Sequence, residues 1–170
     1  MKMNNIFRHH NPMVGIGSLL SLLAMVMLLL TFSSCNKDEG EYFSEPFIRI
    51  ATETGASRTV VKSDVKNVNT YYIYLSSTPL SANLEVNYEV KVGNGLQPGV
   101  DFELVNKTNA LTFLPGIYNM PIRIRWMPHR LDPDKDNTIT ITLVSNSMNL
   151  TMGYPGPDHL QRELVIEKQN

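Results

Sequence analysis

The sequence contains a single cysteine, Cys35, among its 170 residues. One thiol excludes an internal disulfide, so packing must hold the fold together even in an oxidising compartment. Basic residues are not in excess either, because the sequence has 15 Lys and Arg and 16 Asp and Glu. Without a basic stripe to follow a phosphate backbone, no nucleic-acid partner is expected.

Catalytic motifs are also missing. The sequence has no HExxH zinc motif, no glycine-rich phosphate loop and no serine in a nucleophile-elbow context. Two histidines, His129 and His159, follow Cys35 and lie in two different expected loops. Asp158 and His159 could form half of a catalytic pair, but a nucleophile and an oxyanion site would have to come from elsewhere. We therefore expect a protein that is not an enzyme and that needs no cofactor.

The longest apolar run lies near the start of the sequence. Residues 1–12 are polar and basic, residues 13–32 are apolar, and two serines then precede Cys35. A basic start, an apolar stretch and small residues before a cut are typical of a signal peptide. We predict a signal peptide over residues 1–34. The alternative is an uncleaved membrane helix, because a span needs about 20 apolar residues and the run is long enough.

Cys35 and the polar residues after it resemble the lipidation site of bacterial lipoproteins. Lys37, Asp38 and Glu39 resemble the export signal that follows the lipidated cysteine in surface lipoproteins of starch-utilisation systems. The resemblance implies a palmitate-type anchor at Cys35, a flexible tether over residues 35–45, and an outer-membrane protein that faces the cell surface. A solvated charged tether with no export role is the alternative for the three charged residues.

Residues 46–170 show the alternating pattern of β-strands. Alternation of apolar and polar residues places one kind of side chain on each face of a strand. The pattern is clearest at residues 84–92, 122–126 and 138–143, and shorter runs lie at 47–50, 71–75, 111–114 and 164–166. Turns rich in Gly, Pro, Asn and Asp separate these runs, and no sustained helical repeat occurs. We predict one all-β domain, an immunoglobulin-like antiparallel β-sandwich of about seven strands.

Three short motifs lie between residues 99 and 143. Residues 99–102 read Gly-Val-Asp-Phe, residues 111–116 read Leu-Thr-Phe-Leu-Pro-Gly, and an acidic loop precedes the strand expected at 138–143. Together they resemble Calx-β-type domains and small lipid-anchored modules of glycan-utilisation systems. The resemblance implies a non-catalytic module that presents loops to a glycan or to an envelope protein. The alternative is a structural or adhesion module of an envelope complex that calcium stiffens.

The acidic loop is the one candidate metal site. Asp132, Asp134 and Asp136 have the alternate spacing of acids in a calcium loop, and calcium takes oxygen ligands. The loop lacks the glycine and the final glutamate of an EF-hand. Asp and Pro also favour turns by themselves, so a solvated turn is the alternative.

The aromatic residues divide into one core candidate and two loop candidates. Trp126 continues the inward-facing set of its strand, which predicts a core position. Tyr118 and Tyr154 lie in loops bounded by Pro or Gly, where binding residues tend to gather. We take these two tyrosines as candidate ligand contacts, with packing lids as the alternative.

Overall fold

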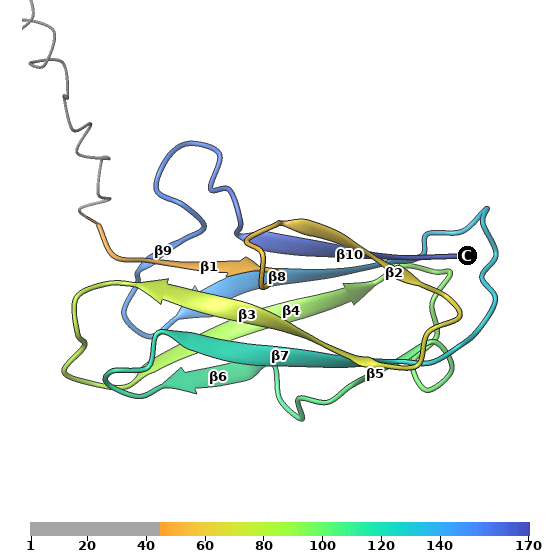
Figure 1. The fold of residues 1–170 in the computed structure, drawn as a ribbon. Helices are drawn as coiled ribbons and strands as arrows, with labels where there is room; N and C mark the ends of the chain where they lie inside the picture. The colour runs from red at the N-terminus through yellow and green to blue at the C-terminus, as the bar shows by residue number, and fades with distance from the viewer. Residues whose placement is uncertain (1–44) are drawn as a thin grey trace, which may run out of the picture. The chain divides into compact units, whose positions relative to one another are not determined.

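The computed structural model describes residues 45–170, which form two β-sheets of five strands each (Figure 1). The predicted signal peptide, Cys35, the residues Lys37, Asp38 and Glu39, and most of the tether lie outside the described residues. Within residues 45–170, no helix has the length and apolar character needed to cross a membrane.

Ten strands build the domain. They are β1 (Phe47–Ala51), β2 (Arg58–Lys62), β3 (Val68–Ser76), β4 (Leu84–Val92), β5 (Phe102–Leu104), β6 (Ala110–Phe113), β7 (Asn119–Trp126), β8 (Thr138–Asn146), β9 (Thr151–Met152) and β10 (Glu163–Gln169). The first sheet has the order β5-β7-β3-β1-β9, and the second sheet has the order β2-β10-β8-β4-β6.

The predicted all-β sandwich is confirmed, but the expected strand number and the purely antiparallel pairing are wrong. There are ten strands rather than about seven, and β1 with β9 and β2 with β10 form parallel pairs. Strands β5 and β9 have three and two residues, too few to show an alternation. Strand β9 joins the first sheet directly after β8 of the second sheet, which is how a parallel neighbour of β1 arises.

The core lies between the two sheets and follows the alternation. Strands β3, β4, β7 and β8 bury every second side chain along most of their length. Trp126 is fully buried, which confirms its predicted core position, and its ring centre lies 6.2 Å from that of Phe102. One irregularity interrupts the ladder between β4 and β8 at Asn87 and Tyr88. A bulge of this kind bends and twists a strand locally.

The registers define two ends of the sandwich. Phe47 at the start of β1 pairs with Ser76 at the end of β3, and Leu84 at the start of β4 pairs with Phe113 at the end of β6. The loops 77–83, 114–118 and 147–150 therefore lie at the end where the chain enters the domain, which we call the proximal end. The loops 63–67, 93–101 and 127–137 lie at the opposite, distal end (Figure 1).

Candidate functional site

A buried ion pair ties the distal loops together. The ammonium of Lys168 in β10 donates to Asp101 Oδ1 at 3.0 Å, to the Asp101 carbonyl at 3.3 Å and to the Met127 carbonyl at 2.8 Å. His129 Nδ1 lies 2.9 Å from the same carboxylate oxygen, and the Gln97 amide donates to Asp101 Oδ2 at 2.9 Å. Both Asp101 and Lys168 are 1% exposed, so the pair is a structural clamp rather than an accessible site.

The hydrogen bonds keep the carboxyl of Asp101 ionised. Burial by itself pushes the pKa of Asp101 upward, because it disfavours the charged form. The bonds from the Gln97 amide, Lys168 and His129, with the charge of Lys168, outweigh burial and hold the pKa of Asp101 below its usual value. The aspartate of the Gly-Val-Asp-Phe motif therefore serves the fold. The sequence does signal the inward position of Lys168, because it continues the inward-facing positions Leu164 and Ile166.

Two of the three aspartates of the acidic loop, Asp132 and Asp136, accept hydrogen bonds from nearby residues. Asp132 Oδ1 accepts from the Asp134 amide at 3.1 Å, while Asp136 Oδ1 accepts from the Thr138 amide at 3.1 Å and its hydroxyl at 2.6 Å. These are the side-chain to backbone bonds of turn-forming aspartates. In residues 45–170, no group of three His, Cys, Asp or Glu side chains is arranged to hold a metal ion. The calcium interpretation stays a prediction.

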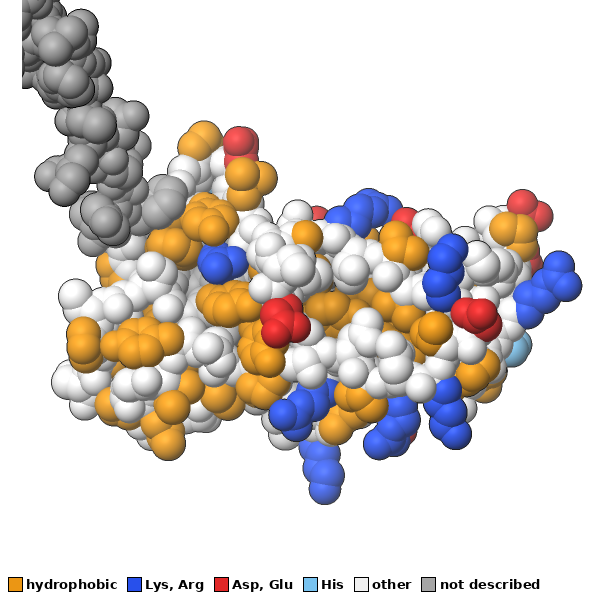
Figure 2. Space-filling model, viewed as in Figure 1, with side chains coloured by type: hydrophobic (Ala, Val, Ile, Leu, Met, Phe, Trp, Pro, Cys, Tyr) orange, Lys and Arg blue, Asp and Glu red, His pale blue; other side chains and the backbone are white. Residues whose placement is uncertain are grey.

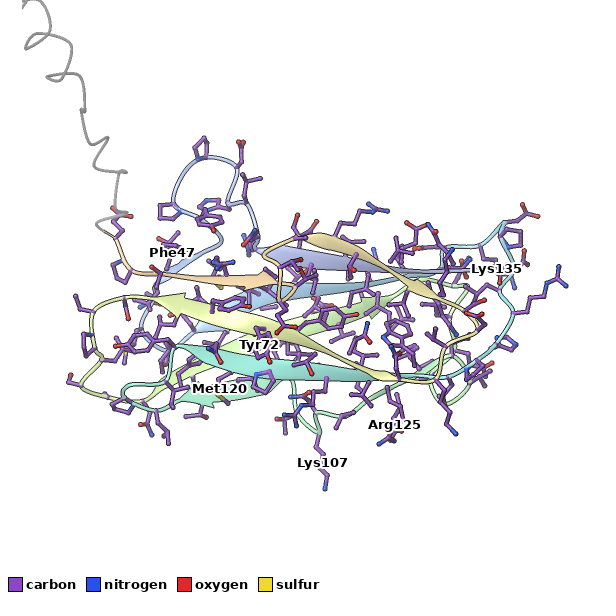
Figure 3. The ribbon with its side chains drawn as sticks, in the orientation of Figure 1. Phe47, Tyr72, Lys107, Met120, Arg125 and Lys135 are labelled. Atoms are coloured by element: carbon purple, nitrogen blue, oxygen red, sulfur yellow. The ribbon has the colours of Figure 1, made fainter. Side chains whose placement is uncertain are left out.

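A cluster of tyrosines and one arginine lies on the outer face of the first sheet. The register places Arg49 of β1 opposite Tyr74 of β3. The Tyr72 and Tyr74 ring centres are 5.8 Å apart, and the Arg49 guanidinium carbon lies 4.4 Å from the Tyr74 centre and 5.5 Å from that of Tyr154. We call Arg49, Tyr72, Tyr74 and Tyr154 the tyrosine face. Figure 3 shows Tyr72 on β3.

The loop of residues 153–162 fixes this cluster in place. Arg49 donates to Gln161 Oε1 at 2.7 Å, and Gln161 also donates to the Gly55 carbonyl at 2.7 Å. The Ile50 amide donates to the Gln161 carbonyl at 2.8 Å, so the loop is bonded directly to β1. A guanidinium held over tyrosine rings gains a cation–π attraction. Arg49 and the loop therefore hold the Tyr74 and Tyr154 rings in place.

The tyrosine hydroxyl beside the arginine stays protonated. Burial raises the pKa of Tyr74, the charge of Arg49 lowers it, and the neighbouring Tyr72 and Glu53 raise it further. The net effect raises the pKa of Tyr74 above its ordinary value. At neutral pH the hydroxyl is therefore available both to donate and to accept a hydrogen bond.

A polar hollow of about 480 Å³ adjoins the tyrosine face. Tyr72 belongs to both, and the other lining side chains are largely hydroxyls, an amide and a carboxylate. They include Thr52, Glu53, Thr54, Thr59, Asn69 and Thr70. The arrangement thus combines flat aromatic surface with many hydrogen-bonding groups.

A second hollow, of about 640 Å³, lies beside the start of β10 and has a different character. Arg58, Arg162, Asp158 and Glu163 bring charges of both signs, and His159 lies beside Asp158 in the same wall. Among its described lining residues there is no tyrosine and no tryptophan. It offers less to a ligand that needs a flat apolar contact.

The structure separates the two predicted ligand tyrosines. Tyr154 belongs to the tyrosine face and packs against Phe47, with ring centres 5.2 Å apart. Tyr118 lies in the 114–118 loop of the proximal end, where its carbonyl accepts from the Leu75 amide at 2.8 Å. Tyr72 and Tyr74 are not among the residues predicted from the sequence. The sequence pattern that points to them is that the outward-facing positions of β3 carry aromatic rings.

The described chain thus defines an all-β domain, a sandwich of two mixed five-stranded sheets with an aromatic outer face. A comparison with protein-family models and with curated proteins finds no match to the sequence. What the domain does must therefore be argued from its own residues.

Proposed function

We propose that this protein is a non-catalytic binding module whose tyrosine face recognises a carbohydrate. The observation that carries the proposal is the pair of tyrosine rings 5.8 Å apart, with Arg49 over one of them, on the outside of a sheet. Sugars present apolar C–H faces, and tyrosines supply flat apolar area with little conformational entropy to lose. The cation–π contact with Arg49 adds to this preorganisation.

The polar hollow supports the same proposal. Sugar hydroxyls need both donors and acceptors, and threonine hydroxyls, an asparagine amide and the Glu53 carboxylate provide them beside Tyr72. Ligand sites of this kind combine an apolar surface with a few polar groups that set orientation. An envelope protein is the second candidate partner for a module displayed at the cell surface.

We further propose that Cys35 anchors the domain in the outer membrane by a lipid and that Lys37, Asp38 and Glu39 direct it to the cell surface. The support is the order of residues alone: a basic start, an apolar run, two serines, the cysteine and an acidic segment. An immunoglobulin-like, Calx-β-type assignment belongs to the same proposal, supported by a sandwich in which the motif residue Asp101 joins distal loops.

Replacing Tyr72 and Tyr74 together by alanine should weaken glycan binding by roughly 30-fold or more, because aromatic contacts at the centre of an interface often contribute 2 kcal/mol or more. A glycan array identifies the ligand, and titration calorimetry measures the affinity of each variant. Tyr118→Ala is the matched control and should bind as the parent does. Equal losses for both variants, or a parent that binds no glycan, would contradict the proposal and favour the adhesion alternative.

Replacing Cys35 by alanine should release the folded domain from the membrane fraction. A lipid chain gains about 0.8 kcal/mol for each buried methylene, so its loss removes the anchor without touching the sandwich. Fractionation and metabolic labelling with palmitate check this. A variant that stays in the membrane with its N-terminus intact would instead support an uncleaved helix over residues 13–32.

A further inference from the structure

The proximal end of the sandwich is free of charge over long stretches of sequence. Residues 67–84, 108–122 and 138–157 contain no Asp, Glu, Lys, Arg or His. The three proximal loops, 77–83, 114–118 and 147–150, all fall within these stretches. In Figure 2, the end of the domain to the left shows hydrophobic and neutral atoms, and the charged side chains gather elsewhere.

The 114–118 loop adds exposed apolar side chains to this end. Leu114, Ile117 and Tyr118 are all exposed, and the Ile117 amide donates to the Leu114 carbonyl at 3.0 Å across a tight turn. Gly116 supports that turn with φ of 84°. The distal end has the opposite character. Its loops carry Asp64, Lys66, Arg130, Asp132, Asp134, Lys135 and Asp136.

The chain enters the domain at the same proximal end. Strand β1 starts there with Phe47, so the apolar run of residues 13–32 and Cys35 both join the domain from this side. The link from Cys35 to Glu45 spans at most about 35 Å when fully extended. A lipid at Cys35 and an uncleaved helix over residues 13–32 would both bring a bilayer within reach of the proximal end.

We propose that the proximal end rests on the lipid bilayer, with Leu114, Ile117 and Tyr118 in the interface. This inference rests on the membrane attachment in the proposed function and adds an orientation to it. Glu45 and Glu85 are exposed near this end, but the three proximal loops carry no charged side chain. Loops without charge avoid desolvating ions at the membrane, and a tyrosine suits the boundary between lipid and water. Three side chains are a small contact, but attachment raises the effective concentration of the domain at the surface.

The orientation has a consequence for binding. With the proximal end on the bilayer, the strands point away from the membrane and the charged distal loops face outward. The tyrosine face lies on the outer surface of the first sheet, along the side of the domain, where it stays open to solvent. Membrane contact and glycan recognition therefore use different surfaces.

The single cysteine permits a direct test. The chain from Cys35 to Asn170 keeps every buried core residue and carries one thiol, which can be coupled to a maleimide lipid in phosphatidylcholine vesicles. Ile117→Trp and Val100→Trp then serve as reporters, because Ile117 is 41% exposed at the proximal end and Val100 is 39% exposed at the distal end. Acyl chains that carry bromine quench tryptophan within the bilayer, and the buried Trp126 is common to both variants.

We expect brominated lipid to quench the emission of Ile117→Trp and shift it to shorter wavelength, with no effect on Val100→Trp. Quenching of both variants alike, or of neither variant, overturns the proposal. The absence of quenching is also the result expected if the proximal end docks on a protein instead of a bilayer. Leu114→Asp introduced into the Ile117→Trp chain should abolish the quenching. The chemical coupling supplies the anchor, so this result does not depend on whether cells lipidate Cys35 or on glycan binding.

Discussion

Replacing Lys168 by methionine should lower the free energy of unfolding by about 3–5 kcal/mol, the cost of breaking a buried ion pair. The Asp101 carboxylate is 1% exposed and would lose its cationic partner. The Met127 and Asp101 carbonyls would lose a donor as well. Urea unfolding followed by the fluorescence of Trp126 measures the change, because Trp126 packs against Phe102, next to Asp101.

A double variant separates the cost of an unpaired buried charge from the loss of the ion pair itself. Asp101→Leu combined with Lys168→Met should recover much of the stability lost in Lys168→Met, because an apolar pair avoids the desolvation of two ions. Glu103→Gln is the matched control for an exposed pair, since the Arg125–Glu103 side chains are about half exposed. It should cost below about 1 kcal/mol. If the double variant is as unstable as Lys168→Met, the uncompensated charge is not the cause.

The loss of stability at acid pH gives a second measure of the Asp101–Lys168 pair. The folded pKa of Asp101 lies below its unfolded value, which is about 3.9, so Asp101 stabilises the fold above that pH. This stability is lost as the pH falls from about 4 through the folded pKa. The parent protein should therefore lose more stability on acidification than the Asp101→Leu, Lys168→Met double variant does.

The alternation of side chains predicted most of the core but not its ionic part. The inward sets of β3, β7 and β8 lie where the sequence placed them, because burial on one face requires a period of two. The alternation marks Lys168 as inward-facing, but it does not identify Asp101 as its partner, since 67 residues separate the two. Only the path of the chain brings β10 beside the 93–101 loop.

The candidate site shows the same limit. The loop position of Tyr154 makes it a candidate from the sequence, yet Arg49 links it to Tyr74, which belongs to a strand in another part of the chain. The register of β1 against β3 decides that Arg49 meets Tyr74, and no local pattern reports that register. Likewise, the uncharged stretches are visible in the sequence, but only the topology gathers their loops at one end.

Replacing Gly153 by alanine should destabilise the domain by roughly 2–5 kcal/mol and weaken the proposed glycan binding as well. Gly153 has φ of 87°, and an added Cβ would lie 2.3 Å from the His159 carbonyl oxygen. The backbone cannot easily withdraw, because the Gly153 amide donates to the Ile48 carbonyl at 2.7 Å. The 153–162 loop would have to move, and Tyr154 follows Gly153 directly into the tyrosine face.

Gly156→Ala is the control within the same loop, since it separates backbone strain from overlap. Gly156 also has a positive φ, 135°, but an added Cβ there would meet no atom within 4 Å. It should show the strain cost, on the order of 1–2 kcal/mol, and keep the parent's glycan affinity. Urea unfolding and titration calorimetry on both variants give the comparison. Equal losses of stability and affinity would mean that overlap with the His159 carbonyl does not displace the loop, and that the loss at Gly153 comes from backbone strain alone.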